Sequence, residues 1–184
     1  MGYPTVANFD KIIIERTKEN LDNSSYANDF TQLLNSLFGL IILPNQMQIQ
    51  GKRDFAFFDT KISDYDKLEF LLKDTEYTIL DEKKGGKFEE IKIRKLIHKH
   101  THLNNIKISE FIERMRNAVA HNGIRPTKDG NNWGGIIIRS YNKDKHIFKW
   151  GDNYDFQLFL TQSELKEICN FLTNKYLDEI NGKN

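Results

Sequence analysis

The feature that most constrains the fold is an apolar stripe of helical spacing in the middle of the chain, directly before a helix stop. Apolar side chains recur at this spacing between residues 106 and 121: Ile108, Phe111, Ile112, Met115 and Val119. Asn122 and Gly123 follow as a stop, and Pro126 prevents the helix from resuming. Because such a helix must bury one face, the sequence predicts an amphipathic helix over 106–121 that packs on a core.

Most other segments also predict helices. Helical patterns cover residues 7–21 and 26–43, and we expect Pro44 to end the second of these helices. Residues 88–103 have a helical pattern with a basic outer face. The motif T-Q-S-E from Thr161 is a capping box that begins a last helix. These patterns predict a mainly helical protein.

A small antiparallel β element is predicted before the last helix. Residues 135–150 alternate and contain N-K-D-K as a turn, which is typical of a β-hairpin, and F-Q-L-F-L is a candidate third strand. The apolar run Phe55 to Phe58 predicts a strand or a buried loop. The expected fold class is therefore mainly α, with one β insertion.

Composition indicates a folded protein with one domain over 1–184, because 184 residues suffice for one core and are few for two. The single cysteine, Cys169, cannot form an internal disulfide, which fits a reducing compartment, and its place on an apolar stripe predicts a core position. No basic segment leads into an apolar run at the start, and the longest apolar run is too short to span a bilayer. We therefore expect a cytoplasmic protein without membrane contact.

The net charge of +1 hides an uneven distribution of charge. From Arg114 to Lys149 there are eight Lys or Arg and two acids, and Lys83 to Lys107 has the same numbers. These regions either form a positive patch that holds a polyanion or are two solvated basic faces.

Arg116, Asn117 and His121 fall in the last turns of the predicted central helix and point away from its apolar stripe. At roughly 100° per residue, Asn117 and His121 share a face with Arg114. Arg116 lies on the other flank, roughly 140° from His121. An imidazole can take a proton near neutral pH, and a guanidinium binds phosphate through two hydrogen bonds. The alternative is that these side chains only cap the helix and complement its dipole.

A complete reaction centre would need a second copy of the chain, because Arg116 and His121 diverge on one helix. Two such helices about a two-fold axis would bring Arg116 of one chain toward His121 of the other. The sequence therefore predicts a homodimer if the cluster is a reaction centre.

The sequence from Arg116 to His121, R-N-A-V-A-H, resembles the R-x4-6-H motif of the HEPN superfamily, with a polar residue directly after the arginine. Residues 31–44, TQLLNSLFGLIILP, resemble the long second helix of a bacterial and plasmid-borne HEPN subgroup. That subgroup also continues from the motif into a β-hairpin and a closing helix. The resemblance covers most of the chain and is loosest over 45–107. It implies a four- to five-helix bundle that dimerises around the motif helix.

The resemblance also implies a function: a metal-independent endoribonuclease that acts as a toxin or in anti-phage defence such as abortive infection. In such an enzyme Arg116 binds the scissile phosphate. His121 is the general base on the ribose 2′-hydroxyl or the acid to the leaving 5′-oxygen. Asn117 orients the side chain of either Arg116 or His121. The RNA product carries a 2′,3′-cyclic phosphate.

Arg114, Asn122 and Arg125 are secondary candidates for substrate binding, Arg114 because it also fits the motif spacing relative to His121. No cofactor is expected, and an antitoxin or a sensor protein is a candidate partner. Some relatives carry a tyrosine two residues after the histidine; Gly123 stands there in this chain, so control by modification of that tyrosine is not expected.

Two further features have alternative interpretations. His98 and His102 would share a face of the helix predicted over 88–103, but a third ligand is missing locally, so no metal site is predicted. Trp133 and Trp150 either pack the hairpin onto the bundle or stack on bases of single-stranded RNA.

Two other functions remain open for the chain as a whole. One is a HEPN module that binds RNA, a nucleotide or a partner protein without cleavage. The other is a helical scaffold that dimerises through the same face.

Overall fold

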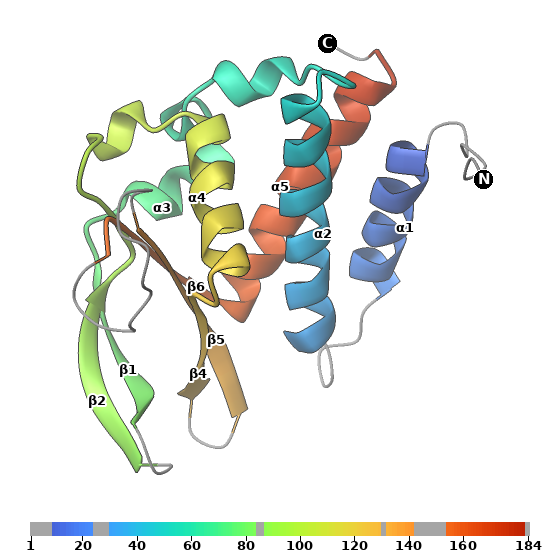
Figure 1. The fold of residues 1–184 in the computed structure, drawn as a ribbon. Coiled ribbons are helices and arrows are strands. Elements are labelled where there is room, and N and C mark those ends of the chain that lie inside the picture. Colours follow the sequence, from blue (N-terminus) through green and yellow to red (C-terminus); the bar gives the residue numbers. More distant parts are fainter. Residues whose placement is uncertain (1–8, 24–29, 84–86, 130–131, 142–153, 183–184) are drawn as a thin grey trace.

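The computed structural model describes residues 9–23, 30–83, 87–129, 132–141 and 154–182. Their helices and strands are α1 (Phe9–Asn23), α2 (Phe30–Ile49), α3 (Glu69–Leu72), β1 (Glu76–Lys83), β2 (Lys87–Arg94), β3 (Leu96–His98), α4 (Ile108–Ala120), β4 (Ile124–Asp129), β5 (Asn132–Ser140), β6 (Phe156–Thr161) and α5 (Gln162–Ile180). The long helices α1, α2, α4 and α5 gather on one side of a twisted sheet (Figure 1).

The fold is α+β, so the prediction of a mainly α, four- to five-helix bundle with one small hairpin is wrong. The described strands form a six-stranded sheet in the order β2-β1-β4-β5-β6-β3. All the neighbouring strands in it are antiparallel. Half of these strands, β1, β2 and β3, come from the region before the motif helix, and β2 and β3 lie where a helix over 88–103 was predicted.

The wrong prediction is the helix over 88–103, where the structure has strands β2 and β3. β1 and β2 form a long hairpin whose register runs from the pair Glu76↔Arg94 to the pair Lys83↔Lys87. Ile91 and Ile93 alternate with charged residues, which is the period of a strand. Lys and Glu fill most intervening positions, and their helix propensity conceals this alternation.

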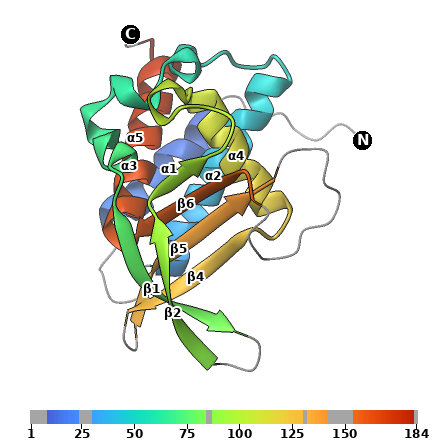
Figure 2. The same cartoon turned by 90° about the vertical axis from the view of Figure 1, so that its left-hand side faces the viewer.

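The sheet curls until its two edges meet. β2 and β3 belong to one segment, separated only by Lys95, yet β2 pairs with β1 at one edge and β3 pairs with β6 at the other. The closure is completed where Gln157 Nε2 donates to the Arg94 carbonyl at 3.0 Å and the Phe159 N–H donates to the Lys95 carbonyl at 2.8 Å. In Figure 2 the β1–β2 hairpin consequently lies in front of β4, β5 and β6. A small apolar cluster is enclosed there: Ile79, Ile93, Ile137 and Phe159.

α2 passes through Pro44 and ends at Ile49, so the prediction that Pro44 stops this helix is wrong. A proline within a helix cannot donate to the carbonyl four residues earlier. Here that carbonyl, on Leu40, accepts a hydrogen bond of 3.0 Å from the hydroxyl of Tyr176, a fully buried residue of α5. The tertiary hydrogen bond replaces the missing helical one.

The predicted last helix is confirmed as α5. The Thr161 hydroxyl accepts from the Glu164 N–H at 3.3 Å, and the Glu164 carboxylate accepts from the Thr161 N–H at 2.8 Å, as a capping box requires. Cys169 is buried, as predicted, and burial raises the pKa of its thiol to about 12. None of the described helices is both long and apolar enough to cross a bilayer.

The predicted hairpin over 135–150 is replaced by a different pairing. β5 pairs with β4 before it and with β6 after it. The proposed second arm, residues 146–150, lies outside the described residues, whereas F-Q-L-F-L is confirmed as β6. Phe55 to Phe58 is neither strand nor simple loop, because residues 56–59 form a 3₁₀ helix with Phe57 and Phe58 buried.

Candidate functional site

The predicted motif helix is confirmed as α4, which buries one face and leaves the motif on the others. Five side chains of α4 are buried in the core: Ile108, Phe111, Ile112, Met115 and Ala118. Arg116 and Asn117 are half-buried, and Ala120 is exposed. Burial of this apolar face therefore sets the rotation of α4, and with it the outward direction of the motif side chains.

The end of α4 is a Schellman motif, which confirms the predicted stop. His121 is the C-cap residue, Asn122 follows in the left-handed region with φ 58°, and the Gly123 N–H donates to the Ala118 carbonyl at 2.7 Å. A Cβ atom at Gly123 would clash with the carbonyl oxygen of Arg139, so only glycine fits there. This tight turn leaves both His121 and Asn122 exposed.

The three motif side chains are available to a ligand. Within the part of the chain that the structure describes, Arg116, Asn117 and His121 have no side-chain hydrogen bond or ion pair. A half-buried guanidinium without a partner has lost part of its hydration without compensation. An anion that reached it would therefore be bound favourably.

One chain does not bring the arginine and the histidine together. Arg116 and His121 are five positions apart on α4, which corresponds to a rotation of roughly 140° around the helix. Arg114, half-buried, lies on the flank of His121. Arg125 lies on β4, where its Nη1 is 3.7 Å from Asp81 Oδ1, so its charge is partly neutralised.

The polar face of α4 that carries Arg114 continues toward a buried histidine. His98 Nε2 lies 3.0 Å from Glu110 Oε1, and its Nδ1 accepts from the Thr101 N–H at 3.0 Å. Burial lowers the pKa of His98; Glu110 opposes this shift and Arg114 adds to it. We interpret this neutral imidazole as part of the packing between β3 and α4.

The sequence suggested that His98 and His102 could share one face of a helix as a pair of metal ligands. The structure does not have this arrangement. His98 is in strand β3, and His102 lies exposed before a 3₁₀ helix. Among the described residues, no three His, Cys, Asp or Glu side chains form a group that could hold a metal ion.

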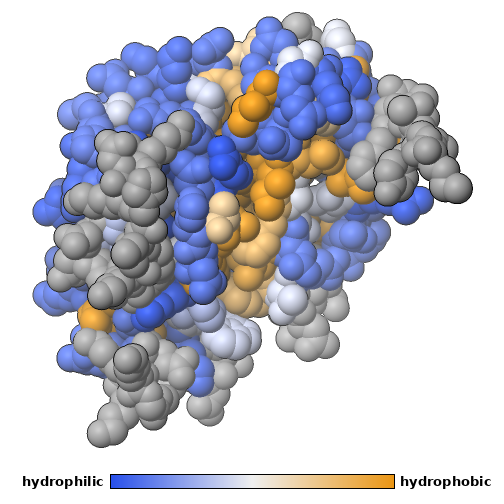
Figure 3. Space-filling model, in the orientation of Figure 1, coloured by the Kyte–Doolittle hydropathy of each residue, from blue (hydrophilic) through white to orange (hydrophobic). Residues whose placement is uncertain are grey.

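An exposed apolar surface that the sequence analysis did not single out lies beside the motif helix. Figure 3 shows it as a strip between α2 and α4. On α2, Ile42 is 42% and Ile49 61% exposed, and Phe38 is half-buried on the same helix face. We call Phe38, Ile42 and Ile49 the α2 strip. The sequence feature that could have predicted this surface is the wide apolar face of α2, because a single core cannot bury all of it.

This helix end, an arginine followed by a polar residue and then a histidine at the C-cap, is that of a HEPN protein. The model of the family HEPN pEK499 p136 matches residues 1–183, so the chain belongs to that family. No curated protein and no solved structure matches the chain. Membership in a HEPN family supports a nuclease or RNA-binding module in general.

Proposed function

We propose that the chain is a metal-independent endoribonuclease whose site is completed by a second copy of the chain. The observation that carries the proposal is the trio of Arg116, Asn117 and His121 at the end of α4 in a HEPN protein, whose side chains have no hydrogen bond or ion pair with the residues that the structure describes. Guanidinium, amide and imidazole are the groups that metal-independent cleavage of RNA needs.

The proposed reaction is an attack by the ribose 2′-hydroxyl. The general base takes the proton of this hydroxyl, the 2′-oxygen bonds to phosphorus, and the 5′-oxygen leaves with a proton from the general acid. His121 serves as base or acid, and Arg116 stabilises the charge that grows on the phosphate oxygens. Asn117 orients the side chain of either Arg116 or His121. The products are a 2′,3′-cyclic phosphate and a 5′-hydroxyl. Arg114 on α4 and Asn122, directly after His121, are proposed to assist substrate binding.

The α2 strip supports the second copy. Large apolar side chains are left in water directly beside the motif helix, and burial against an identical strip would remove them from water. A two-fold axis there also resolves the divergence of Arg116 and His121, because each arginine would face the histidine of the partner subunit. Arg125 contributes less than the others, since Asp81 already neutralises part of its charge.

The proposal is tested by incubating the protein with single-stranded RNA in EDTA. We expect cleavage, with 2′,3′-cyclic phosphate ends detected by their resistance to enzymes that require a free 3′-hydroxyl. RNA that is bound but recovered intact would instead select the non-cleaving RNA-binding module. RNA that is neither bound nor cut at any protein concentration would refute both. The proposed role as toxin or in anti-phage defence, and control by an antitoxin or sensor, rest on this activity.

Replacement of Ile42 by glutamate is expected to separate the subunits. A carboxylate in a packed apolar interface loses its hydration, so dissociation should become at least about 100-fold easier, and cleavage should fall with it. Light scattering coupled to size exclusion measures the mass. The matched control is Asn174→Glu, which adds the same charge at an exposed position of α5. An Ile42→Glu protein that remains dimeric and active would exclude the α2 strip as the interface.

A further inference from the structure

A row of polar side chains runs along one face of α4 to its C-cap: Glu110, Arg114, Asn117 and His121. At roughly 100° per residue these side chains fall within an arc of about 60°, on a flank away from the buried face. Arg114 comes two turns before His121, so it lies about 10 Å nearer the start of the helix. A guanidinium at this distance would meet a neighbouring phosphate of an RNA strand rather than the phosphate at His121.

Glu110 would ordinarily neutralise Arg114. A glutamate four positions before an arginine is its neighbour on the helix surface, and such pairs commonly form ion pairs. Here no ion pair joins the two half-buried side chains, and the Arg114 side chain has neither a hydrogen bond nor an ion pair with any described residue. The Glu110 carboxylate is therefore engaged elsewhere.

The segment that follows β3 engages this carboxylate. Thr101 Oγ1 donates to Glu110 Oε1 at 3.1 Å, and His98 Nε2 lies 3.0 Å from the same oxygen. His98 Nδ1 accepts from the Thr101 N–H at 3.0 Å. Because a neutral imidazole carries one proton, that proton is on Nε2 and faces the carboxylate. A hydroxyl and an imidazole N–H thus both meet one oxygen of Glu110.

His98 can hold the carboxylate steadily because its side chain is buried and neutral. Burial lowers the pKa of His98, with Arg114 and His100 acting in the same direction and Glu110 and Asp155 against it. The effect of Arg114 shows that its guanidinium lies close to this pair. A neutral imidazole leaves the negative charge on Glu110, so a carboxylate released from His98 would be drawn to Arg114.

We propose that His98 is a positioning residue: it holds Glu110 away from Arg114, and Arg114 is thereby left open for an RNA phosphate beside the scissile one. Guanidinium is suited to this role because it binds phosphate through two charge-assisted hydrogen bonds. The inference rests on the proposed ribonuclease function and adds a flanking phosphate subsite to it.

The test measures binding of a labelled 2′-O-methyl RNA oligonucleotide, which cannot be cleaved, by fluorescence anisotropy at several salt concentrations. Arg114→Ala should weaken binding about tenfold and lower the slope of log Kd against log salt by about 0.7, the value for one phosphate contact on a single strand. His98→Phe keeps an aromatic ring against Phe156, whose centroid is 6.0 Å away, but removes the N–H. We expect it to change Kd and slope in the same direction as Arg114→Ala.

Rescue distinguishes positioning from damage to the fold. In the His98→Phe protein, Glu110→Gln should restore the parental Kd and salt slope, because an amide has no charge with which to pair Arg114. The matched control, Glu113→Gln in the same background, removes an acid of α4 outside the row and should not restore them.

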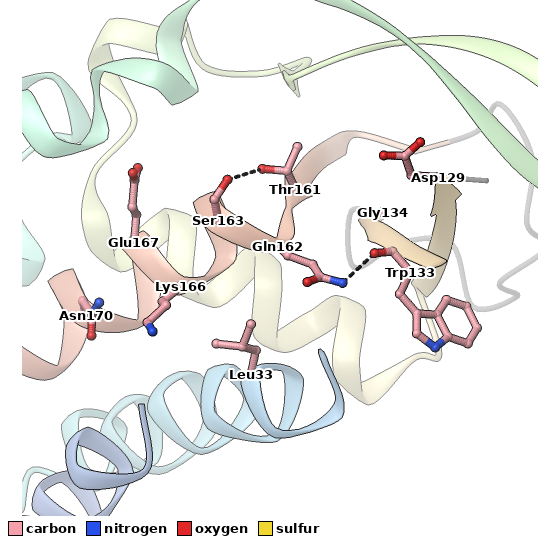
Figure 4. A pocket seen from close by; sticks show the side chains of 10 residues that line it. All are labelled: Leu33, Asp129, Trp133, Gly134, Thr161, Gln162, Ser163, Lys166, Glu167 and Asn170. Atoms are coloured by element: carbon pink, nitrogen blue, oxygen red, sulfur yellow. Dashed lines mark hydrogen bonds between the residues drawn. The ribbon is translucent and has the colours of Figure 1, made fainter. Parts of the chain in front are cut away.

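A second control removes a positive charge elsewhere. Lys166 lines a cavity of about 580 Å³ at the start of α5 (Figure 4), and none of the described residues that line this cavity belongs to α4. Lys166→Ala should therefore keep the parental salt slope.

The outcomes separate this inference from the proposed function. If the parent binds and cuts RNA while a folded His98→Phe protein keeps the parental Kd and slope, or is not rescued by Glu110→Gln, the inference is refuted and the ribonuclease stands. If the parent neither binds nor cuts RNA, both are refuted. Thermal unfolding is measured as well; should His98→Phe unfold, Thr101→Val, which removes only the hydroxyl bound to Glu110, decides by the same Kd, slope and rescue.

Discussion

Replacement of His121 by alanine is expected to lower the rate of RNA cleavage by about 10²- to 10⁴-fold, the usual contribution of a general acid or base. Affinity for RNA should change little, because the guanidinium of Arg116 remains. Stability should also be unchanged, since His121 is exposed and its side chain has no hydrogen bond among the described residues. The initial rate on labelled RNA measures the effect.

A matched control separates this effect from the loss of any exposed imidazole. His102 is also exposed but lies outside α4, so His102→Ala should cleave RNA at the parental rate. Equal cleavage by the His121→Ala protein and the parent would end the catalytic proposal.

Mixing two inactive variants extends the same prediction to the composite site. A heterodimer of Arg116→Ala and His121→Ala subunits has one site with both changes and one site with neither. If arginine and histidine come from different subunits, each heterodimer has about half of the parental rate, and an equimolar mixture with random exchange, in which about half of the dimers are heterodimers, should regain about a quarter of it. Recovery of no activity, with heterodimers present by mass, would mean that each site uses its own chain.

The motif helix could be predicted from the sequence because its determinants are local. The spacing from Ile108 to Val119 selects the buried face, and Asn122 with Gly123 supplies the Schellman stop within a few residues. The capping box at Thr161 is local in the same sense. Once this helix was predicted, the directions in which Arg116, Asn117 and His121 point relative to its buried face followed from the helical repeat.

The sheet could not be predicted in the same way, because its determinants are distant in sequence. β1 and β2 have many Lys and Glu residues, and only pairing with β4 and closure onto β6 make them strands. Pro126 indicated only that a helix stops, although it lies opposite Ile136 within the pairing of β4 and β5. The partial neutralisation of the Arg125 charge also depends on a tertiary contact, since its partner Asp81 comes from another strand.

The same dependence on distant contacts predicts the largest effect on stability. Lys95, between β2 and β3, is fully buried, and its Nζ lies 2.6 and 2.5 Å from the two carboxylate oxygens of Glu164 on α5. The ring of Tyr77 lies 4.2 Å and that of Phe159 5.0 Å from the same ammonium. The ion pair therefore joins the closing edge of the sheet to the first turn of α5.

Glu164→Gln is expected to lower the free energy of unfolding by about 3 kcal/mol, because it leaves the Lys95 charge buried without its partner. Glutamine can still accept from the Thr161 N–H, so the capping box persists and the loss reports the charge. Lys95→Met should cost less, since Glu164 is 17% exposed and keeps its hydrogen bonds with Thr161. The double variant should be more stable than Glu164→Gln alone, which urea unfolding of all four proteins measures. Additive losses would mean that the two side chains are not coupled, and the closure of the sheet would then depend on its backbone hydrogen bonds and its enclosed apolar cluster.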